Sequence, residues 1–513
     1  MVRVALRFAA VGVFVSCAAT LPPLPKPVPV PYRPLNRPPP MTTVLLPVKN
    51  KPIVSFRLVF HAGSVDDPKG KEGLTALTAQ LMAEGGTKKL SSAQLLDALY
   101  PMAAELDAST DKEVTVFVGR VHSDRLQRFF DIFSDVLLEP RFDLKELERL
   151  RTDAINTVKN RLRAEDDEEL GKIALDALLY PDHPYRHFPG GTVQGLQAIT
   201  LEDVKAHAAR VFTQDRLVIG LAGAVDSALE AKVKKRLAKL PATGAPRVEL
   251  PPAPGVQGHT LILKKNTLST AVSMGYTYPL RRGDPDFYAV AFALSYLGEH
   301  RQFHGVLFQE LREKRGLNYG DYAYAEHFHQ EGWGTQPSFN VARAEQDFSI
   351  WLRPVEPPNA IFATRGALHY LTELTKNPPP LEQMETARGF LIGYTRLWEQ
   401  TDQRRLGLAI DELFYGTPGF LEGYRQALAT MTPHALQQAA ARHLTPSKLN
   451  FVYVTQDAED LEARLASKKP SPIRYPTSKP AEVTKKDKTL EREPLPMHPQ
   501  LIRIQDAQVF MEN

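Results

Sequence analysis

The chain has 513 residues, of which 43% are hydrophobic and 24% are charged. This composition is typical of a globular protein and leaves room for two or more domains with ordinary cores. The formal net charge of +4 is small for this length and gives no indication of a nucleic-acid partner. Beyond the first twenty residues, no apolar run is long enough to cross a bilayer.

The first residues have the pattern of a bacterial secretory signal. Arg3 and Arg7 precede a short apolar run that ends at Cys17, the only cysteine of the chain. Cys17 stands where a lipoprotein signal places its lipidated residue. We therefore expect residues 1–17 to be a signal that anchors the protein in the bacterial cell envelope, in the periplasm or on the outer membrane. Signal cleavage without a lipid is the alternative, because Phe14 stands where such signals usually have leucine.

Residues 18–40 follow as a proline-rich segment, and half of residues 21–40 are proline. Such a sequence favours extended polyproline conformations and acts as a semi-rigid spacer. We expect a stalk that holds the globular part away from the membrane surface. A ligand for a proline-binding module is the alternative.

The remainder divides into two halves that open alike. A cluster of proline and glycine at residues 241–257 is typical of a linker. Residues 44–60 and 261–276 each read as a strand, a Lys/Asn turn and a second strand. Each half then continues with two expected helices and a strand: helices at 126–138, 144–162, 360–374 and 381–399, and strands at 217–222 and 449–454.

Strands interleaved with paired helices predict an α+β fold. We expect two homologous domains, at residues 41–240 and 258–470, each a mainly antiparallel sheet with helices packed on one face. The polar stretch 471–513 is rich in proline and lysine, and we expect a tail that wraps loosely or is partly disordered.

Residues 73–82 predict an amphipathic helix just after the first pair of strands. With this helix in place, the layout resembles the pitrilysin/insulinase family of zinc metallopeptidases over residues 41–470. Short members of that family are built from two such α+β domains. Local matches support the resemblance: Gly73-Leu74 and Gly86-Thr87 at the ends of the helix, Asp182-His183-Pro184-Tyr185 with Gly190-Gly191-Thr192, and residues 198–204 and 223–226 towards the end of the first domain.

The resemblance implies that the zinc site of the family is lost. Family members carry H-x-x-E-H, in which two imidazoles on one helix face bind zinc and the carboxylate takes a proton from the metal-bound water. The corresponding positions here are Ala76, Ala79 and Gln80. The third ligand of the family falls on Thr157 and its supporting acidic residue on Leu150. We therefore expect no cofactor in this chain.

The second half retains a different motif. Residues 307–319 look like the family's Arg/Tyr motif, which by position carries over to Arg312 and Tyr319. In the family, this pair hydrogen-bonds the bound peptide and helps to polarise its scissile carbonyl. A guanidinium and a phenol can both donate to a developing oxyanion. Without the resemblance, Arg312 is a surface helix residue and Tyr319 an ordinary strand aromatic.

A lost metal site beside a retained Arg/Tyr pair favours a non-catalytic subunit of a two-chain peptidase. The expected partner is a homologous chain that carries H-x-x-E-H and zinc, and the expected substrate of this heterodimer is an unfolded peptide. One alternative is a peptidase-like scaffold or peptide-binding lipoprotein with no hydrolysis. Another is an active zinc metalloendopeptidase with an unrecognised site, although the chain contains no H-x-x-E-H.

Overall fold

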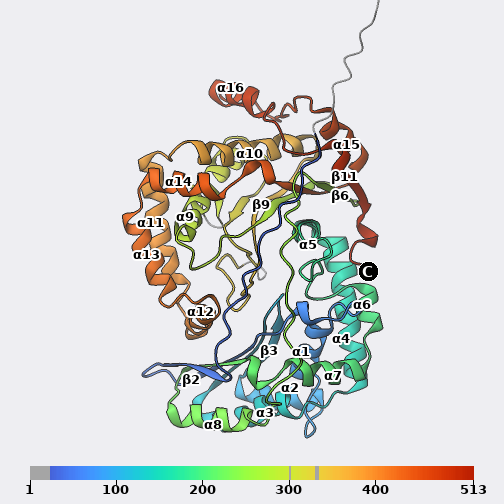
Figure 1. Cartoon of the computed structure of the whole chain (residues 1–513), viewed down its shortest axis with the longest axis vertical. Helices are drawn as coiled ribbons and strands as arrows, with labels where there is room; N and C mark the ends of the chain where they lie inside the picture. The colour runs from blue at the N-terminus through green and yellow to red at the C-terminus, as the bar shows by residue number, and fades with distance from the viewer. Residues whose placement is uncertain (1–22, 300–301, 330–333) are drawn as a thin grey trace, which may run out of the picture.

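A computed structural model describes residues 23–299, 302–329 and 334–513. Cys17 and the expected signal lie outside the described residues. The chain forms two lobes, which are stacked one above the other in Figure 1, and each lobe is built on one sheet. In the part of the chain described here, no helix is both long and apolar enough to span a membrane.

The first sheet has five strands in the order β1-β5-β2-β4-β3. β1 and β5 pair in parallel, and the other neighbours pair antiparallel. The expected second strand, residues 53–60, is β2 to the residue, because Val54, Phe56, Leu58 and Phe60 alternate along it and share one buried face of the sheet. The strands are β1 (Thr42–Pro47), β2 (Ile53–Phe60), β3 (Glu105–Thr110), β4 (Thr115–His122) and β5 (Leu217–Gly223).

The second sheet has six strands in the order β11-β6-β10-β7-β9-β8. Its strands β6-β10-β7-β9-β8 repeat the order and the parallel first pair of the first sheet, which confirms the α+β fold built from two similar halves. The strands are β6 (Thr260–Lys264), β7 (Thr270–Tyr278), β8 (Asp321–Tyr324), β9 (Gln346–Val355), β10 (Asn450–Thr455) and β11 (Ile502–Asp506).

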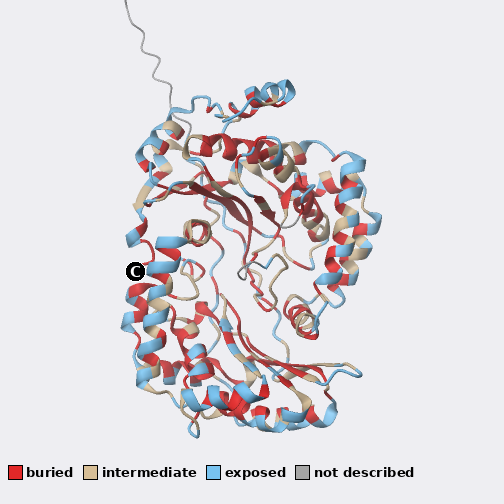
Figure 2. Ribbon diagram, turned by 180° about the vertical axis from the view of Figure 1, so that it is seen from behind, coloured by how far each residue is buried: buried red, intermediate tan, exposed pale blue. Residues whose placement is uncertain are grey.

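Helices cover the outer face of each sheet (Figure 2). The first lobe and its edge hold α1 (Leu74–Glu84), α2 (Ser92–Leu99), α3 (Leu126–Leu138), α4 (Leu144–Asn156), α6 (Val193–Ala198), α7 (Leu201–Val211) and α8 (Ser227–Leu237). The expected helix 144–162 is α4 followed by a π-helical segment, Thr157–Glu165. The second lobe holds α9 (Phe287–Gly298), α10 (Ala360–Lys376), α11 (Leu381–Leu397), α13 (Phe420–Thr430), α14 (Pro433–His443), α15 (Ala458–Ser467) and α16 (Ala481–Leu490).

In addition, one helix from each half crosses to the inner face of the other sheet. α5 (Asp167–Leu179) packs on β7, β9 and β10, and α12 (Asp402–Tyr415) packs on β1, β2 and β5. Gly220 in β5 permits this close approach, since a Cβ there would lie 2.8 Å from Cδ1 of Ile410. The two lobes are therefore interlocked rather than merely linked.

The described part of the expected stalk, residues 23–40, does not project but lies along the molecule. The amide of Val30 donates to the carbonyl of Ala253 at 2.9 Å, so the segment pairs with the expected linker. Arg33 forms a bidentate ion pair with Asp284, with N–O distances of 2.8 and 2.7 Å, and Leu35 is buried against α12. Proline removes donors without preventing an extended segment from packing, and Val30 and Leu35 of this segment are buried.

The expected polar tail is also folded. β11 pairs in parallel with β6 at the edge of the second sheet, and Phe510 and Met511 are buried beside α5 and the linker. Arg163, in the π-helical segment, donates to the carbonyl of Phe510 at 2.5 Å. The apolar residues near the end of the chain therefore complete the second lobe and tie it to the first.

Candidate functional site

α1 occupies the place expected for the metal-binding helix. The backbone amides at its start, which have no partner within the helix, are capped by the Asp67 carboxylate, which accepts from the amides of Gly73 at 2.8 Å and Thr75 at 2.7 Å. The Thr75 hydroxyl lies 2.8 Å from Nε2 of His207, and burial lowers the pKa of His207 to about 4. This imidazole is therefore neutral and belongs to the packing of α1.

The positions that correspond to the zinc ligands, the catalytic base and the supporting acid of the family hold no metal-binding side chain. Ala79 is 1% exposed and packs in the core against the first sheet, whereas Ala76 is half-buried and Gln80 is exposed. The Thr157 hydroxyl donates back to the carbonyl of Asp153 at 3.0 Å. Leu150 packs with leucines of α1 in an apolar cluster. Across the described ranges, no three His, Cys, Asp or Glu side chains are grouped to hold a metal ion. These residues do not fit zinc.

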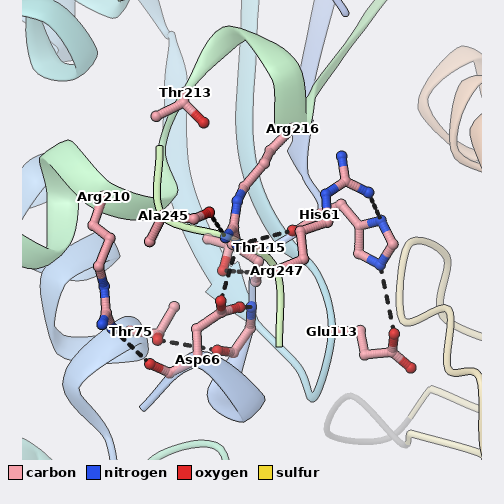
Figure 3. A network of polar contacts seen from close by, with 12 residues as sticks. His61, Asp66, Thr75, Glu113, Thr115, Arg210, Thr213, Arg216, Ala245 and Arg247 are labelled. Carbon is pink, nitrogen blue, oxygen red and sulfur yellow. Dashed lines mark hydrogen bonds and ion pairs between the residues drawn. The ribbon is translucent and has the colours of Figure 1, made fainter. Parts of the chain in front are cut away.

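A buried polar network fixes the turn that leads into α1 (Figure 3). Arg216 donates to a carboxylate oxygen of Asp66 and to the carbonyl of Ala245, each at 2.9 Å. Arg210 donates to the backbone carbonyl of Asp66, also at 2.9 Å. Because these guanidinium groups hold backbone carbonyls in place, their role is structural.

The same network contains an imidazole, His61, but both of its ring nitrogens are engaged (Figure 3). Arg247 donates to Nδ1 at 2.7 Å, and Nε2 lies 3.5 Å from the Glu113 carboxylate. A guanidinium can only donate, so Nδ1 is the acceptor and Nε2 carries the proton. His61 therefore offers no free lone pair to a metal.

The structure brings Arg312 and Tyr319 together. Cζ of Arg312, in the π-helical segment Phe308–Glu313, lies 4.6 Å from the centre of the Tyr319 ring. Such stacking leaves the edge of the guanidinium open to hydrogen-bond acceptors. Among the described residues, Arg312 has an ion pair with Glu313 at 3.6 Å. Tyr319 is 66% exposed, so its phenol is accessible to a ligand.

A second arginine supports this pair. Cζ of Arg353, in β9, lies 5.7 Å from the Tyr319 ring, and its Nε lies 3.5 Å from the carboxylate of Glu168 in α5. Lys172, one turn later in α5, lies 4.0 Å from the Trp351 ring. Arg312 and Tyr319 therefore lie beside the face of the second sheet that α5 covers, which is the face towards the first lobe.

Sequence reasoning missed a buried charged cluster between the lobes. Arg343, just before β9, forms a bidentate ion pair with Asp111 in the β3–β4 turn, at 2.9 and 2.8 Å. The guanidinium holds the pKa of Asp111 well below its usual range, against the effect of burial. Burial lowers the pKa of Lys112 to about 8, and its ammonium donates to the carbonyls of Tyr185 and His187 at 2.7 and 2.6 Å.

Burial raises the pKa of two acids of this region. The pKa of Glu345 is raised to about 8, first by desolvation and then by the nearby charge of Glu113. Desolvation, followed by the charge of Asp176, raises the pKa of Asp347. Charged residues in a short turn usually lie at the surface, so no sequence pattern indicated this cluster beyond the Asp-His-Pro-Tyr loop that reaches it.

Comparison with known proteins gives similarity over most of the chain. Residues 43–179 match the family described as Insulinase (Peptidase family M16), and residues 198–347 match the Peptidase M16 inactive domain. A Helicobacter pylori protein named Non-peptidase homolog YmxG is 23% identical over 420 residues, which are 80% of this chain and 90% of that protein. An uncharacterized zinc protease of Mycobacterium tuberculosis is 28% identical over 412 residues, covering 78% and 89% of the two chains.

Solved structures show the same fold. A peptidase M16 inactive domain from Pseudomonas fluorescens superposes with a TM-score of 0.71 at 23% identity, covering 83% of this chain and 98% of that one. A protease from Helicobacter pylori superposes with a TM-score of 0.68 at 18% identity, covering 83% and 100%. At these identities the likeness concerns the fold.

Proposed function

Because this chain belongs to the insulinase family of peptidases (family M16), as a non-catalytic member, we propose that it is one half of a two-chain metallopeptidase. In this proposal, a homologous partner chain carries H-x-x-E-H and zinc, and this chain supplies Arg312 and Tyr319. The observation that carries the proposal is the contrast within one chain. Ala79 is sealed in the core at the position of the catalytic base, while Tyr319 stays open to solvent beside Arg312.

The roles proposed for the two side chains follow from their chemistry. A guanidinium stacked on a phenol ring has its N–H groups directed outwards in one plane, and the phenol hydroxyl is a further donor. Both can donate to the carbonyl oxygen of a bound unfolded peptide and stabilise the negative charge that develops on it. Arg353, which is paired with Glu168 at 3.5 Å, lies 5.7 Å from the centre of the Tyr319 ring and helps to preorganise the donors.

The proposed location is the bacterial cell envelope, with a lipid on Cys17 as the anchor. The support is the charged and apolar signal that ends at this single cysteine. An envelope location also agrees with a chain in which no disulfide can form within the molecule. The substrate would then be an unfolded peptide outside the cytoplasm.

A second candidate is a scaffold or peptide-binding lipoprotein without hydrolysis, which the name of the Helicobacter relative, Non-peptidase homolog, favours. A third is an active zinc enzyme with an unrecognised site, in line with relatives named as zinc proteases. The scaffold predicts that no H-x-x-E-H chain accompanies the protein. The active enzyme predicts zinc in the isolated protein and cleavage that a chelator stops.

The test is turnover of a peptide by the complex that contains this chain. Arg312→Ala is expected to lower kcat by about 100- to 1,000-fold, as the loss of an oxyanion donor does. Tyr319→Phe keeps the ring under Arg312 and removes the hydroxyl alone, so a loss there assigns the effect to the donor. Arg396→Ala, which removes an exposed arginine of the outer helix α11, is the matched control. Unchanged turnover with Arg312→Ala would reject the role.

A further inference from the structure

The net charge of the protein is concentrated in one segment. Residues 468–493 contain eight Lys and Arg against four Asp and Glu, so this segment alone accounts for the chain's formal net charge of +4, and the rest is balanced. The segment comprises α16 and the loops on either side of it. Its basic residues are Lys468, Lys469, Arg474, Lys479, Lys485, Lys486, Lys488 and Arg492.

The fold sorts these charges by sign. Asp487 is buried and accepts from Nε of Arg315 at 2.8 Å and from the Tyr475 hydroxyl at 2.7 Å. Glu493 lies 2.8 Å from the imidazole of His369, and Glu491 is 4% exposed. Of the four acids, Glu482 remains exposed. The surface of the segment is therefore more positive than its composition.

The basic side chains point outwards. Lys488 and Arg492 approach Glu491 at 3.5 and 3.7 Å, yet their side chains are 73% and 65% exposed. Lys485 is exposed on the same helix, and Lys468 and Lys469 are exposed on the preceding loop. Figure 2 shows α16 projecting from the end of the second lobe, with exposed residues along it. The result is a dispersed set of solvated charges rather than a pocket.

The described chain begins at this same end of the molecule (Figure 1). Pro25 and the carbonyl of Pro496 both lie beside Gly258, at 3.4 and 3.3 Å from a Cβ placed there. Cys17 precedes Pro25 by eight residues, a reach of about 28 Å for an extended chain. A lipid on Cys17 would therefore hold this end of the second lobe close to a bilayer.

We propose that the outward face of residues 468–492, with α16 at its centre, docks on the anionic phospholipid headgroups of the membrane that holds Cys17. Two observations select this partner. The face carries charges complementary to those of the headgroups, and the described chain begins at the same end of the molecule. Solvated lysines suit a diffuse, negatively charged surface, and each basic side chain near such a surface contributes about 1 kcal/mol. Docking would orient the protein on the membrane, with the segment that carries Arg312 behind α16, to which Arg315 is joined by its ion pair with Asp487 at 2.8 Å. The inference rests on the lipid anchor proposed above for Cys17, but not on the proposed role of Arg312 and Tyr319 in a peptidase.

The experiment measures the partition of unacylated protein between buffer and lipid vesicles. Residues 18–513 retain every described residue and carry no acyl group. We expect retention on vesicles that contain phosphatidylglycerol, little retention on pure phosphatidylcholine, and release from the former by salt. The variant K485Q/K488Q/R492Q is expected to bind about 100-fold more weakly, since each lost charge costs about fivefold.

The matched control removes three exposed lysines at the opposite end of the molecule, on and just after α8: K232Q/K235Q/K239Q. It is expected to bind like the parent. Equal loss in both variants, or equal binding to neutral and anionic vesicles, would overturn the proposal. So would binding to soluble heparin without binding to anionic vesicles, because the face would then recognise another polyanion.

Discussion

The buried ion pair between Asp111 and Arg343 is expected to hold the two lobes together. It joins the β3–β4 turn of the first lobe to the segment before β9 of the second, and the side chains are 12% and 3% exposed. Asp111→Asn would leave the Arg343 guanidinium buried with Asp176 at 3.6 Å as its nearest remaining carboxylate. Removing one partner of a buried pair costs about 3–5 kcal/mol, because the other charge stays desolvated.

Urea unfolding of residues 18–513, followed by far-UV circular dichroism, measures this cost as a change in the free energy of unfolding. Arg343→Met should cost a similar amount, and the double variant should lose at least about 2 kcal/mol less than the sum of the two. Glu105→Gln provides the control. Its partner Arg120 lies 3.2 Å away on the same hairpin, but the two side chains are 58% and 47% exposed, so less than about 1 kcal/mol is expected. An equally small loss for Asp111→Asn would refute the reasoning.

Three further results are expected. The pKa of Glu345 is about 8 in the folded state instead of 4.5, so the free energy of unfolding should fall as the pH rises from about 4.5 to 8. Glu345→Gln should make the free energy of unfolding less dependent on pH over this range, as measured by urea titrations at several pH values. Ala79→Glu should destabilise the protein by several kcal/mol, because it buries an unpaired carboxylate, whereas exposed Gln80→His should change stability by less than about 0.5 kcal/mol. Truncation after residue 500 should lower the unfolding temperature sharply, because it removes β11 and the buried Phe510; a chain that melts like the full protein would mean that the tail is dispensable.

Local pattern was enough to predict many of the elements. The helix expected at residues 126–138 is α3, because its phenylalanines and leucines recur with a helical period and all face the core. The helix expected at 381–399 ends two residues earlier, at Leu397, within the usual uncertainty of helix ends. The repeated strand-turn-strand openings predicted two similar halves, and the structure has one sheet in each.

The arrangement between the halves was not predictable in the same way. α5 packs on the sheet of the second half, and α12 packs on the sheet of the first half. The expected stalk, described from residue 23 to residue 40, and strand β11 each pair with a segment more than 200 residues away. The hydrophobic periodicity of a segment gives no information on contacts with such distant segments. Proline and lysine content suggested solvated segments, but a few buried apolar residues in each, such as Leu35 and Phe510, hold the segment against the rest of the fold.

The candidate site was predicted in part. Sequence spacing placed Arg312 and Tyr319 seven residues apart, and the structure stacks them at 4.6 Å. Sequence spacing could not show that Arg353 and Glu168 support the pair, because these residues come from β9 and from α5 of the other half. The roles of the pair in a peptide complex remain a prediction.

The most direct test of the central claim is to purify the tagged protein gently from the envelope of its own cells and to identify what accompanies it. We predict a second two-domain chain that carries H-x-x-E-H, in near-equal amount and with zinc bound to it. The purified pair should hydrolyse unfolded peptides, and this chain alone should not. Recovery of this chain by itself, without such a partner, would contradict the account and favour a scaffold or peptide-binding protein.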